Sequence, residues 1–169
     1  MRAPSDISSH DTAEDRTERF AGYAQAQMKI TNVDGTTLLL RPRTEPGTSG
    51  SYPFGAEAVH VITAFDPGPV TLSPEQNAGR QDELLTALDE MSVAMWEALS
   101  GAADGTHEES SVVVEGLSDD DARTLGAACG QEAIFRWSRE TWSVLPCDDA
   151  PAVHLGWEVE EVGDDTVSR

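Results

Sequence analysis

Basic residues are scarce in this sequence. Lys29 is the only lysine, and 11 basic side chains face 31 acidic ones, which leaves a formal net charge of −20 over 169 residues. Binding to nucleic acid depends on clustered Lys and Arg that neutralise phosphates, so we expect no direct nucleic-acid binding. The favoured explanation of the acidity is a GC-rich bacterial genome or a salt-loving organism. The alternative is an acidic decoy that occupies a nucleic-acid-binding partner.

Long apolar runs and paired cysteines are absent too. No stretch approaches the roughly 18 consecutive apolar residues of a membrane helix, and residues 1–6 lead into polar residues instead of an apolar signal stretch. Cys129 and Cys147 are the only cysteines, and their spacing fits neither a zinc motif nor a disulfide scaffold. We therefore expect a cytoplasmic protein with no membrane segment.

The familiar catalytic and phosphate-binding motifs are missing as well. The chain contains no GxGxxG or GxxxxGK[ST] loop, no GxSxG elbow and no HExxH pair. The sequence His107-Glu108-Glu109 is the nearest approach to a metal motif, but three adjacent residues point in different directions on a regular element. We therefore predict no metal site and no cofactor, and the residues are compatible with a binding domain and with an enzyme.

Apolar residues are sufficient for one folded domain. They make up 38% of the chain and include four Trp and four Phe, enough to bury a core. The pattern predicts a mobile N-terminal arm over residues 1–20, a single domain over residues 21–147 and an acidic C-terminal extension over residues 148–169. Residues 154–157 are expected to dock part of this extension on the domain.

Alternating apolar residues and turn signals predict the strands. An Asp-Gly pair between two β-prone runs indicates a hairpin over residues 28–40. Residues 59–65 form the strongest strand, and because both of its faces are largely apolar we expect it to lie at the centre of a sheet. Further strands are predicted over residues 111–115, 132–137 and 141–145. Residues 93–99 fit a strand or a helix, and the strand is favoured.

Two helices are predicted between the strands. Ser73 and Pro74 begin the first with a capping box, and it should run to about residue 91. Ser118 caps the second, whose first turn is acidic, and Gly130 ends it. The order of elements predicts an α+β fold: a mixed, mainly antiparallel sheet with two interleaved helices packed largely on one face.

Several short segments occur in an order that resembles a known family. They are residues 61–68, residues 73–77 with Arg80, residues 108–110 and residues 130–135. The series resembles a bacterial domain-of-unknown-function family, number 3293, over roughly residues 25–146. Asp66 stands where the family more often has Asn, and Phe65 stands where Trp is frequent. The resemblance implies one compact domain and carries no reaction with it.

One group of polar residues is a candidate ligand site. Asn77, Arg80, Leu84 and Leu88 recur at helical spacing, so they lie along one side of the first helix. The leucines should face the sheet, which places Asn77 and Arg80 on the inward stripe near the helix N-terminus. Free N–H groups and a guanidinium predict a site for a small anionic or carboxylate ligand. The expected ligand-binding residues are Arg80, Asn77, Asp66, Thr63, His60, Glu109 and Gln131.

A structural role for the same residues stays open. An arginine on a buried side needs a partner because an unpaired charge there is costly. The candidate partners within the chain are Asp66, Glu108 and Glu109. Arg80 would then serve an internal ion pair, and Asn77 would tie down the loop after the central strand.

Two functions follow as hypotheses. The first is a small-ligand binding domain, with or without enzymatic activity, that uses Arg80 and its neighbours. The second is an acidic protein-interaction, inhibitor or accessory module, because residues 104–121 contain seven acidic side chains and no Lys or Arg. A charged interface of this kind predicts partner binding that weakens as salt is added.

Overall fold

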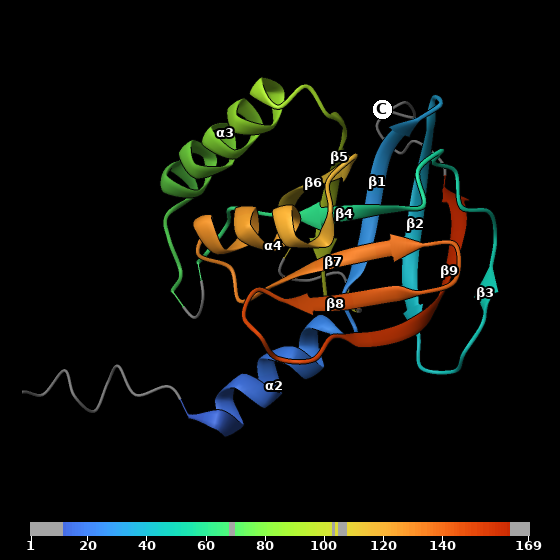
Figure 1. Cartoon of the computed structure of the whole chain (residues 1–169), viewed down its shortest axis with the longest axis horizontal. Coiled ribbons are helices and arrows are strands. Elements are labelled where there is room, and N and C mark those ends of the chain that lie inside the picture. The colour runs from blue at the N-terminus through green and yellow to red at the C-terminus, as the bar shows by residue number, and fades with distance from the viewer. Residues whose placement is uncertain (1–11, 68–69, 103, 105–107, 163–169) are drawn as a thin grey trace, which may run out of the picture.

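The computed structural model describes residues 12–67, 70–102, 104 and 108–162, and its centre is a closed antiparallel barrel (Figure 1). The barrel strands are β1 (Gln27–Val33), β2 (Thr36–Arg43), β4 (Ala58–Ile62), β5 (Ala94–Gly101), β6 (Glu109–Glu115), β7 (Ala133–Ser138), β8 (Trp142–Pro146) and β9 (Val153–Val162). Neighbours follow the order β2-β1-β5-β6-β4-β7-β8-β9, and β9 pairs back onto β2. The short strand β3 (Thr48–Ser49) lies parallel to β9 outside this circuit.

The closed barrel corrects the fold class expected from the sequence. We predicted a mixed, mainly antiparallel open sheet with two helices, whereas the eight barrel strands of the described chain are all antiparallel and close on themselves, and three helices accompany them. The physical reason is the pairing of β9 with β2, which runs from Thr37↔Val162 to Arg43↔Gly156. This pairing satisfies the backbone groups that two open edges would leave exposed.

The individual strands agree with the sequence more closely than their arrangement does. The hairpin predicted over residues 28–40 is formed by β1 and β2, and the hairpin at residues 132–145 by β7 and β8. The strand predicted at residues 59–65 is β4, which pairs with β6 on one side and with β7 on the other. In a closed barrel every strand has two neighbours, so no strand is central. The apolar residues on both faces have another reason: Val59 and Val61 face the barrel interior, whereas Ile62 packs under the helices.

Aromatic side chains fill the inside of the barrel. Trp137 and Trp142 are fully buried there, and the Trp137 ring meets the rings of Tyr52 and Trp157 edge to face, with centroids 5.2 Å apart in each pair. The Trp157 indole N–H donates to the backbone oxygen of Ser138 at 2.9 Å. A small closed barrel is filled by its own side chains, so this aromatic cluster serves as the main core.

Helices α3 (Pro74–Glu90) and α4 (Asp119–Ala128) cover one flank of the barrel (Figure 1). Both begin as the sequence predicts: Ser73 and Gln76 form a capping box, and Ser118 accepts from the backbone N–H of Asp121. A second apolar cluster lies between these helices and the outer face of the strands. It includes Ile62, Val112, Val114, Ile134 and Leu145 of the barrel, Leu84 and Leu88 of α3 and Ala122 of α4.

Helix α2 (Ala13–Tyr23) occupies part of the segment that we expected to be an irregular arm. Thr12 accepts from the N–H of Asp15, whose carboxylate accepts from the N–H of Thr12 in return, and this reciprocal cap starts the helix. At the other end of the chain, β9 places residues 153–162 in the barrel. Residues 1–11 and 163–169, which belong to the predicted arm and extension, lie outside the described residues. The domain limits at residues 20 and 147 stay a prediction.

No helix in the described part of the chain has the length and apolar character needed to cross a membrane. The longest, α3, has 17 residues and mixes apolar with acidic side chains.

Candidate functional site

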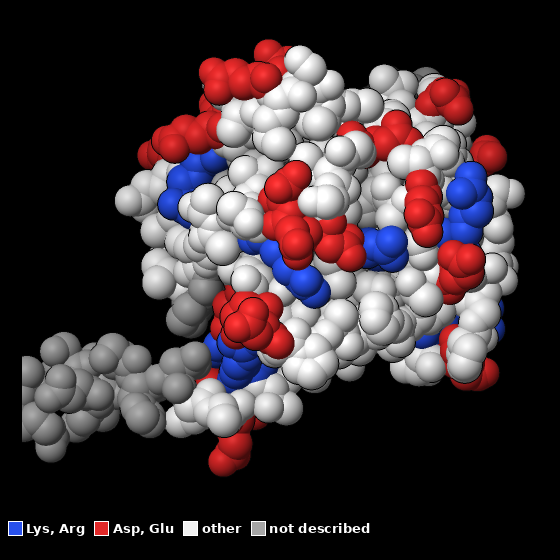
Figure 2. Space-filling view, in the orientation of Figure 1, with Lys and Arg blue, Asp and Glu red and all other residues white. Residues whose placement is uncertain are grey.

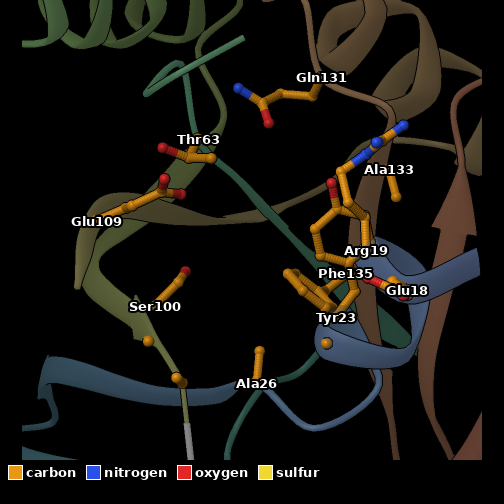
Figure 3. Close-up of a pocket in the computed structure, with 13 residues that line it drawn as sticks. Glu18, Arg19, Tyr23, Ala26, Thr63, Ser100, Glu109, Gln131, Ala133 and Phe135 are labelled. Carbon is orange, nitrogen blue, oxygen red and sulfur yellow. The ribbon is translucent and has the colours of Figure 1, made fainter. Parts of the chain in front are cut away.

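A cavity of about 710 Å³ lies at one end of the barrel, between the strands and helix α2 (Figure 3). Its wall combines small and aromatic residues with a few polar side chains. The described lining residues are Glu18, Arg19, Gly22, Tyr23, Ala26, Thr63, Ser100, Gly101, Ala102, Glu109, Gln131, Ala133 and Phe135. We call this cavity the barrel mouth.

Because side chains alternate between the two faces of a strand, the inward-facing residues at the ends of four neighbouring strands point into the barrel mouth. In β6, Glu109 shares a face with Ser111 and Val113, and Val113 belongs to the interior core. The same count along β4 places Thr63 on the face of Val59 and Val61, one step beyond the end of the strand. Inward residues at these strand ends therefore project into the mouth instead of the packed core.

Pairing across the sheet brings the polar residues of the mouth together. Ser100 of β5 is the direct partner of Glu109 of β6, so both side chains lie on one face of the sheet. The Ser100 and Ser111 hydroxyls are 2.5 Å apart, and the Thr63 hydroxyl donates to the backbone oxygen of Ser110 at 2.7 Å. The hydroxyls on this wall are thus fixed in position by the barrel itself.

Phe135 forms the aromatic floor of the mouth. Its ring stacks on Trp142 with centroids 5.1 Å apart and an interplanar angle of 13°. Ala133 lies two residues earlier on the same face of β7 and leaves open space that a larger side chain would fill. The cavity therefore exists because small residues replace the bulky ones that fill the rest of the barrel.

Glu109 is the most perturbed acid in the barrel mouth. Burial, together with the nearby charge of Asp66, raises the pKa of its carboxyl from 4.5 to about 7. Among the described residues we find no hydrogen bond or ion pair to this carboxyl. Figure 3 shows Glu109, Thr63 and Ser100 on one side of the cavity and Tyr23, Arg19 and Phe135 on the other.

Helix α2 is held over the mouth by two side chains that meet Glu132. The Arg19 guanidinium donates from Nε and Nη2 to the two carboxylate oxygens, each at 2.6 Å, and the Tyr23 hydroxyl donates at 2.8 Å. Arg19 lowers the pKa of Glu132, while burial and the hydrogen bond to Glu132 raise the pKa of Tyr23. None of the residues of α2 is buried, so polar contacts dominate its attachment.

The predicted group around Arg80 forms a network that shapes the loop between β4 and α3. Arg80 donates from Nε to the backbone oxygen of Ala64 at 2.9 Å and from Nη2 to that of Cys129. Asn77 accepts from the N–H of Asp66 and donates to its carboxylate, at 2.9 and 3.0 Å. Backbone carbonyls, not the carboxylates considered from the sequence, are the partners found for Arg80. A ligand-binding role for Arg80, Asn77 and Asp66 stays a prediction.

The other predicted site residues fall in two places. Thr63, Glu109 and Gln131 line the barrel mouth, and Gln131 donates to the backbone oxygen of Phe65 at 2.7 Å. His60 points to the outer face instead, where its Nε2 lies 2.7 Å from Asp119 Oδ1. The structure therefore brings three of the seven residues together and separates His60 from them.

Two nearby charges define the surroundings of His60. Asp119 also accepts from Arg136 Nε at 3.0 Å. Burial lowers the pKa of His60. Burial acts to raise the pKa of Asp119, but the hydrogen bonds from His60 and Arg136 hold it below its usual value. This cluster joins β4, β7 and the first turn of α4, so it fastens the helix to the barrel.

A family model described as a protein of unknown function (DUF3293) matches residues 62–134. The chain resembles this family. The match confirms the resemblance indicated by the sequence over a shorter stretch than residues 25–146. No curated protein and no solved structure matches the chain.

The DUF3293 match covers one wall of the barrel mouth. It contains Thr63, Glu109 and Gln131 together with the Arg80 network, whereas Arg19 and Tyr23 of α2 lie before it. The part of the chain that resembles DUF3293 thus supplies the polar wall, and the N-terminal helix supplies the cover.

The residues that complete the mouth were not predicted from the sequence. Arg19 lies in the segment expected to be an arm, residues 1–20, and Tyr23 lies just after it. The Thr12-x-x-Asp15 cap of this helix was present in the sequence but differs from the usual capping box with Glu or Gln. Ser100 and Phe135 follow the period of two in their strands. That period was visible, but it does not tell which inward residue meets a cavity and which meets the core.

The segment His107-Glu108-Glu109 includes His107, which lies outside the described residues. Within the described ranges, no group of three His, Cys, Asp or Glu side chains could hold a metal ion. Glu109 faces the barrel mouth and Glu108 is exposed. The two carboxylates are thus directed to different surroundings.

Proposed function

We propose that this domain binds a small, mainly apolar molecule in the barrel mouth. The observation that carries the proposal is the cavity itself, about 710 Å³ within a barrel whose remaining interior is filled with aromatic and aliphatic side chains. Ligand pockets in proteins occupy roughly 300–1,000 Å³ and combine apolar walls with a few fixed polar groups. The barrel mouth has this size and this composition.

The polar wall supports binding of an oriented ligand. Thr63, Ser100 and Gln131 are held by hydrogen bonds to the barrel or its loops, so they do not need to be ordered when a ligand enters. Such preorganisation lowers the entropic cost of binding. Arg80 lies outside this lining, so the proposal does not depend on an anion-binding arginine.

A cavity-filling substitution tests the proposal. Nile red, an uncharged apolar dye, should bind the purified protein with saturation at one dye per chain. Ala133→Phe places a ring inside the mouth and should weaken binding at least tenfold, whereas Ala78→Phe, on an exposed position of α3, should leave it unchanged. Equal dye affinity of the two variants, or no saturable binding to the unmodified protein, would refute the proposal.

A second candidate function is binding of a basic protein partner through α3. Its exposed acidic side chains gather on the flank of the molecule shown at the upper left of Figure 2; they are Glu75, Asp82, Glu83, Asp89 and Glu90. In the stretch at residues 104–121, three of the seven acidic side chains have other contacts: Glu109 enters the mouth, Glu115 accepts from a backbone N–H, and Asp119 meets His60. Capture of a basic partner should be lost when the salt concentration is raised, and also when the acidic side chains of α3 are replaced by neutral ones; both losses would support this candidate. Capture that is insensitive to both changes would exclude it.

A further inference from the structure

The charged side chains that line the barrel mouth differ in the ion pairs that they form within the described structure. Three charged residues line it in the described structure: Glu18, Arg19 and Glu109. The Arg19 guanidinium is engaged by both oxygens of Glu132, so the one cation of the wall is already paired with an anion. Glu109 has no such partner among the described residues. Within the described part of the chain, the mouth therefore presents an acid that lacks a counter-ion.

We infer that the molecule bound in the barrel mouth is an organic cation, a protonated amine on an apolar body, whose charge is balanced by Glu109. The inference rests on the proposed function, since it specifies what the same cavity binds. A carboxylate partly removed from water loses solvation that an opposite charge can restore. The ammonium group of the ligand supplies that charge at the strand end.

The opposite wall suits the rest of such a ligand. Tyr23 and Phe135 place aromatic rings across the cavity from Glu109 (Figure 3). Aromatic faces attract cations and also pack against apolar chains. An amine that reaches Glu109 therefore has its charge between a carboxylate and aromatic rings, and its apolar part on the Phe135 floor.

The surrounding field favours cations over anions. Asp66 lies close enough to influence Glu109, and its carboxylate adds to the negative charge on that side of the mouth. The chain as a whole has a net charge of −20. A field of this sign concentrates cations near the opening and repels anions. An anionic ligand in the mouth would meet Glu109 and Glu18, and Arg19, the one cation among the described lining residues, is already paired with Glu132.

Three probes with one apolar body and different head groups test the inference. 4-Phenylbutylamine, 4-phenylbutanol and 5-phenylpentanoate carry a cation, a neutral hydroxyl and an anion, and each competes with Nile red at pH 8. The amine should bind at least tenfold more tightly than the alcohol, and the anion should bind most weakly. Equal displacement by amine and alcohol, or failure of the amine to displace the dye, would overturn the inference.

Two variants separate a specific role of Glu109 from general attraction by an acidic protein. Glu109→Gln should reduce the preference for amine over alcohol to less than twofold while Nile red still binds, which also shows that the variant is folded. Glu18→Gln removes the other carboxylate of the lining and should change the preference less than twofold. A preference that survives in Glu109→Gln refutes the assignment to this residue. The proposed function fails separately, through unchanged dye binding in Ala133→Phe.

Discussion

Arg19 and Glu132, 113 residues apart in the chain, form a two-point ion pair with both Arg19 N···Glu132 O distances at 2.6 Å. Arg19 belongs to helix α2 and Glu132 to the connection between α4 and β7. Because α2 contributes no buried residue, polar contacts hold the helix over the cavity: this pair, the Tyr23 hydroxyl bond to Glu132 and the more exposed Arg16–Asp148 pair at 3.0 Å. Glu132 therefore receives two of the side chains that attach the cover of the barrel mouth.

Substitution of Glu132 should loosen helix α2. Glu132→Gln removes the charge that pairs with Arg19, and because both side chains are mostly shielded from water the expected loss is about 1–3 kcal/mol of unfolding free energy. In hydrogen-exchange measurements, the substitution should accelerate the exchange of the amides of residues 13–23 more than that of the amides in the barrel strands. As a control, Glu160→Gln breaks the exposed pair with Arg41 and should change stability by less than about 0.5 kcal/mol. Equal exchange rates in α2 of the variant and the unmodified protein would contradict the prediction.

The raised pKa of Glu109 predicts a definite pH dependence of stability. Its pKa is about 7 in the folded protein against 4.5 in the reference state, so the folded protein holds this proton more tightly than the unfolded chain does. The contribution of Glu109 is therefore greatest below pH 4.5 and is lost as pH rises towards and past 7, by at most about 3 kcal/mol.

A neutral isostere isolates this contribution from the other acids. Glu109→Gln cannot ionise, so the variant should match the unmodified protein near pH 4.5 and exceed its unfolding free energy at pH 8. Urea denaturation at several pH values measures the difference between the two proteins. A difference that stays constant from pH 4.5 to 8 would show that Glu109 titrates normally.

The side chain of Asn77 should be important for stability. It is buried, and its amide satisfies both the N–H and the carboxylate of Asp66, a residue held at a positive φ of 40°. Asn77→Ala leaves the N–H of Asp66 without this partner and its carboxylate with only the bond from the N–H of Leu72, and should cost about 1–3 kcal/mol. Thr86→Ala, at an exposed position of the same helix, should change stability by less than about 0.5 kcal/mol. Similar denaturation midpoints for the two variants would show that the loop does not need Asn77.

Glycine at position 130 is required by both backbone and space. Its φ is +78°, and a Cβ atom added there would lie 2.5 Å from Pro67 Cβ. Gly130→Ala should therefore destabilise the protein by about 2–4 kcal/mol. Gly79→Ala is the matched control with the opposite sign: a Cβ on this helical glycine of α3 meets no atom within 4 Å, and the change should stabilise by about 0.5–1 kcal/mol. Thermal unfolding of both variants checks the two signs together.

The local elements could be predicted because their signals lie within a few residues. Ser73 with Gln76, and Ser118 before an acidic first turn, fix the starts of α3 and α4 without reference to the rest of the chain. The run of apolar residues on both faces of residues 59–65 likewise predicted a buried strand, which is β4. The helix caps depend on hydrogen bonds between residues close together in the sequence, and the strand shows its apolar pattern within a few residues.

Closure of the barrel could not be predicted in the same way. It depends on β9 meeting β2, and Leu155, Trp157 and Val159 alternate with polar residues as in any half-buried strand. The period of two indicates a strand but not its partner. Because the acidic residues near residue 160 suggested a solvated tail, this segment was assigned to an extension instead of the barrel.

The candidate site was predicted in part for a related reason. Helical spacing correctly placed Asn77 at a buried position, and it directed attention to the loop that carries Thr63. It did not identify the backbone carbonyls that take up the donors of Arg80, nor the helix that covers Glu109. Both depend on segments that are distant in sequence and meet only after the strands have paired.

The seam between β2 and β9 has a consequence for synthesis on the ribosome. The two partners lie near opposite ends of the described chain, so every intermediate that ends before residue 153 has β1 and β2 available but nothing to pair with the outer edge of β2. Unsatisfied strand edges readily accept strands from neighbouring chains. A nascent polypeptide of this protein is thus most prone to self-association just before the ten residues of β9 emerge from the ribosome. Once β9 has emerged, it pairs with β2 and covers the open strand edge.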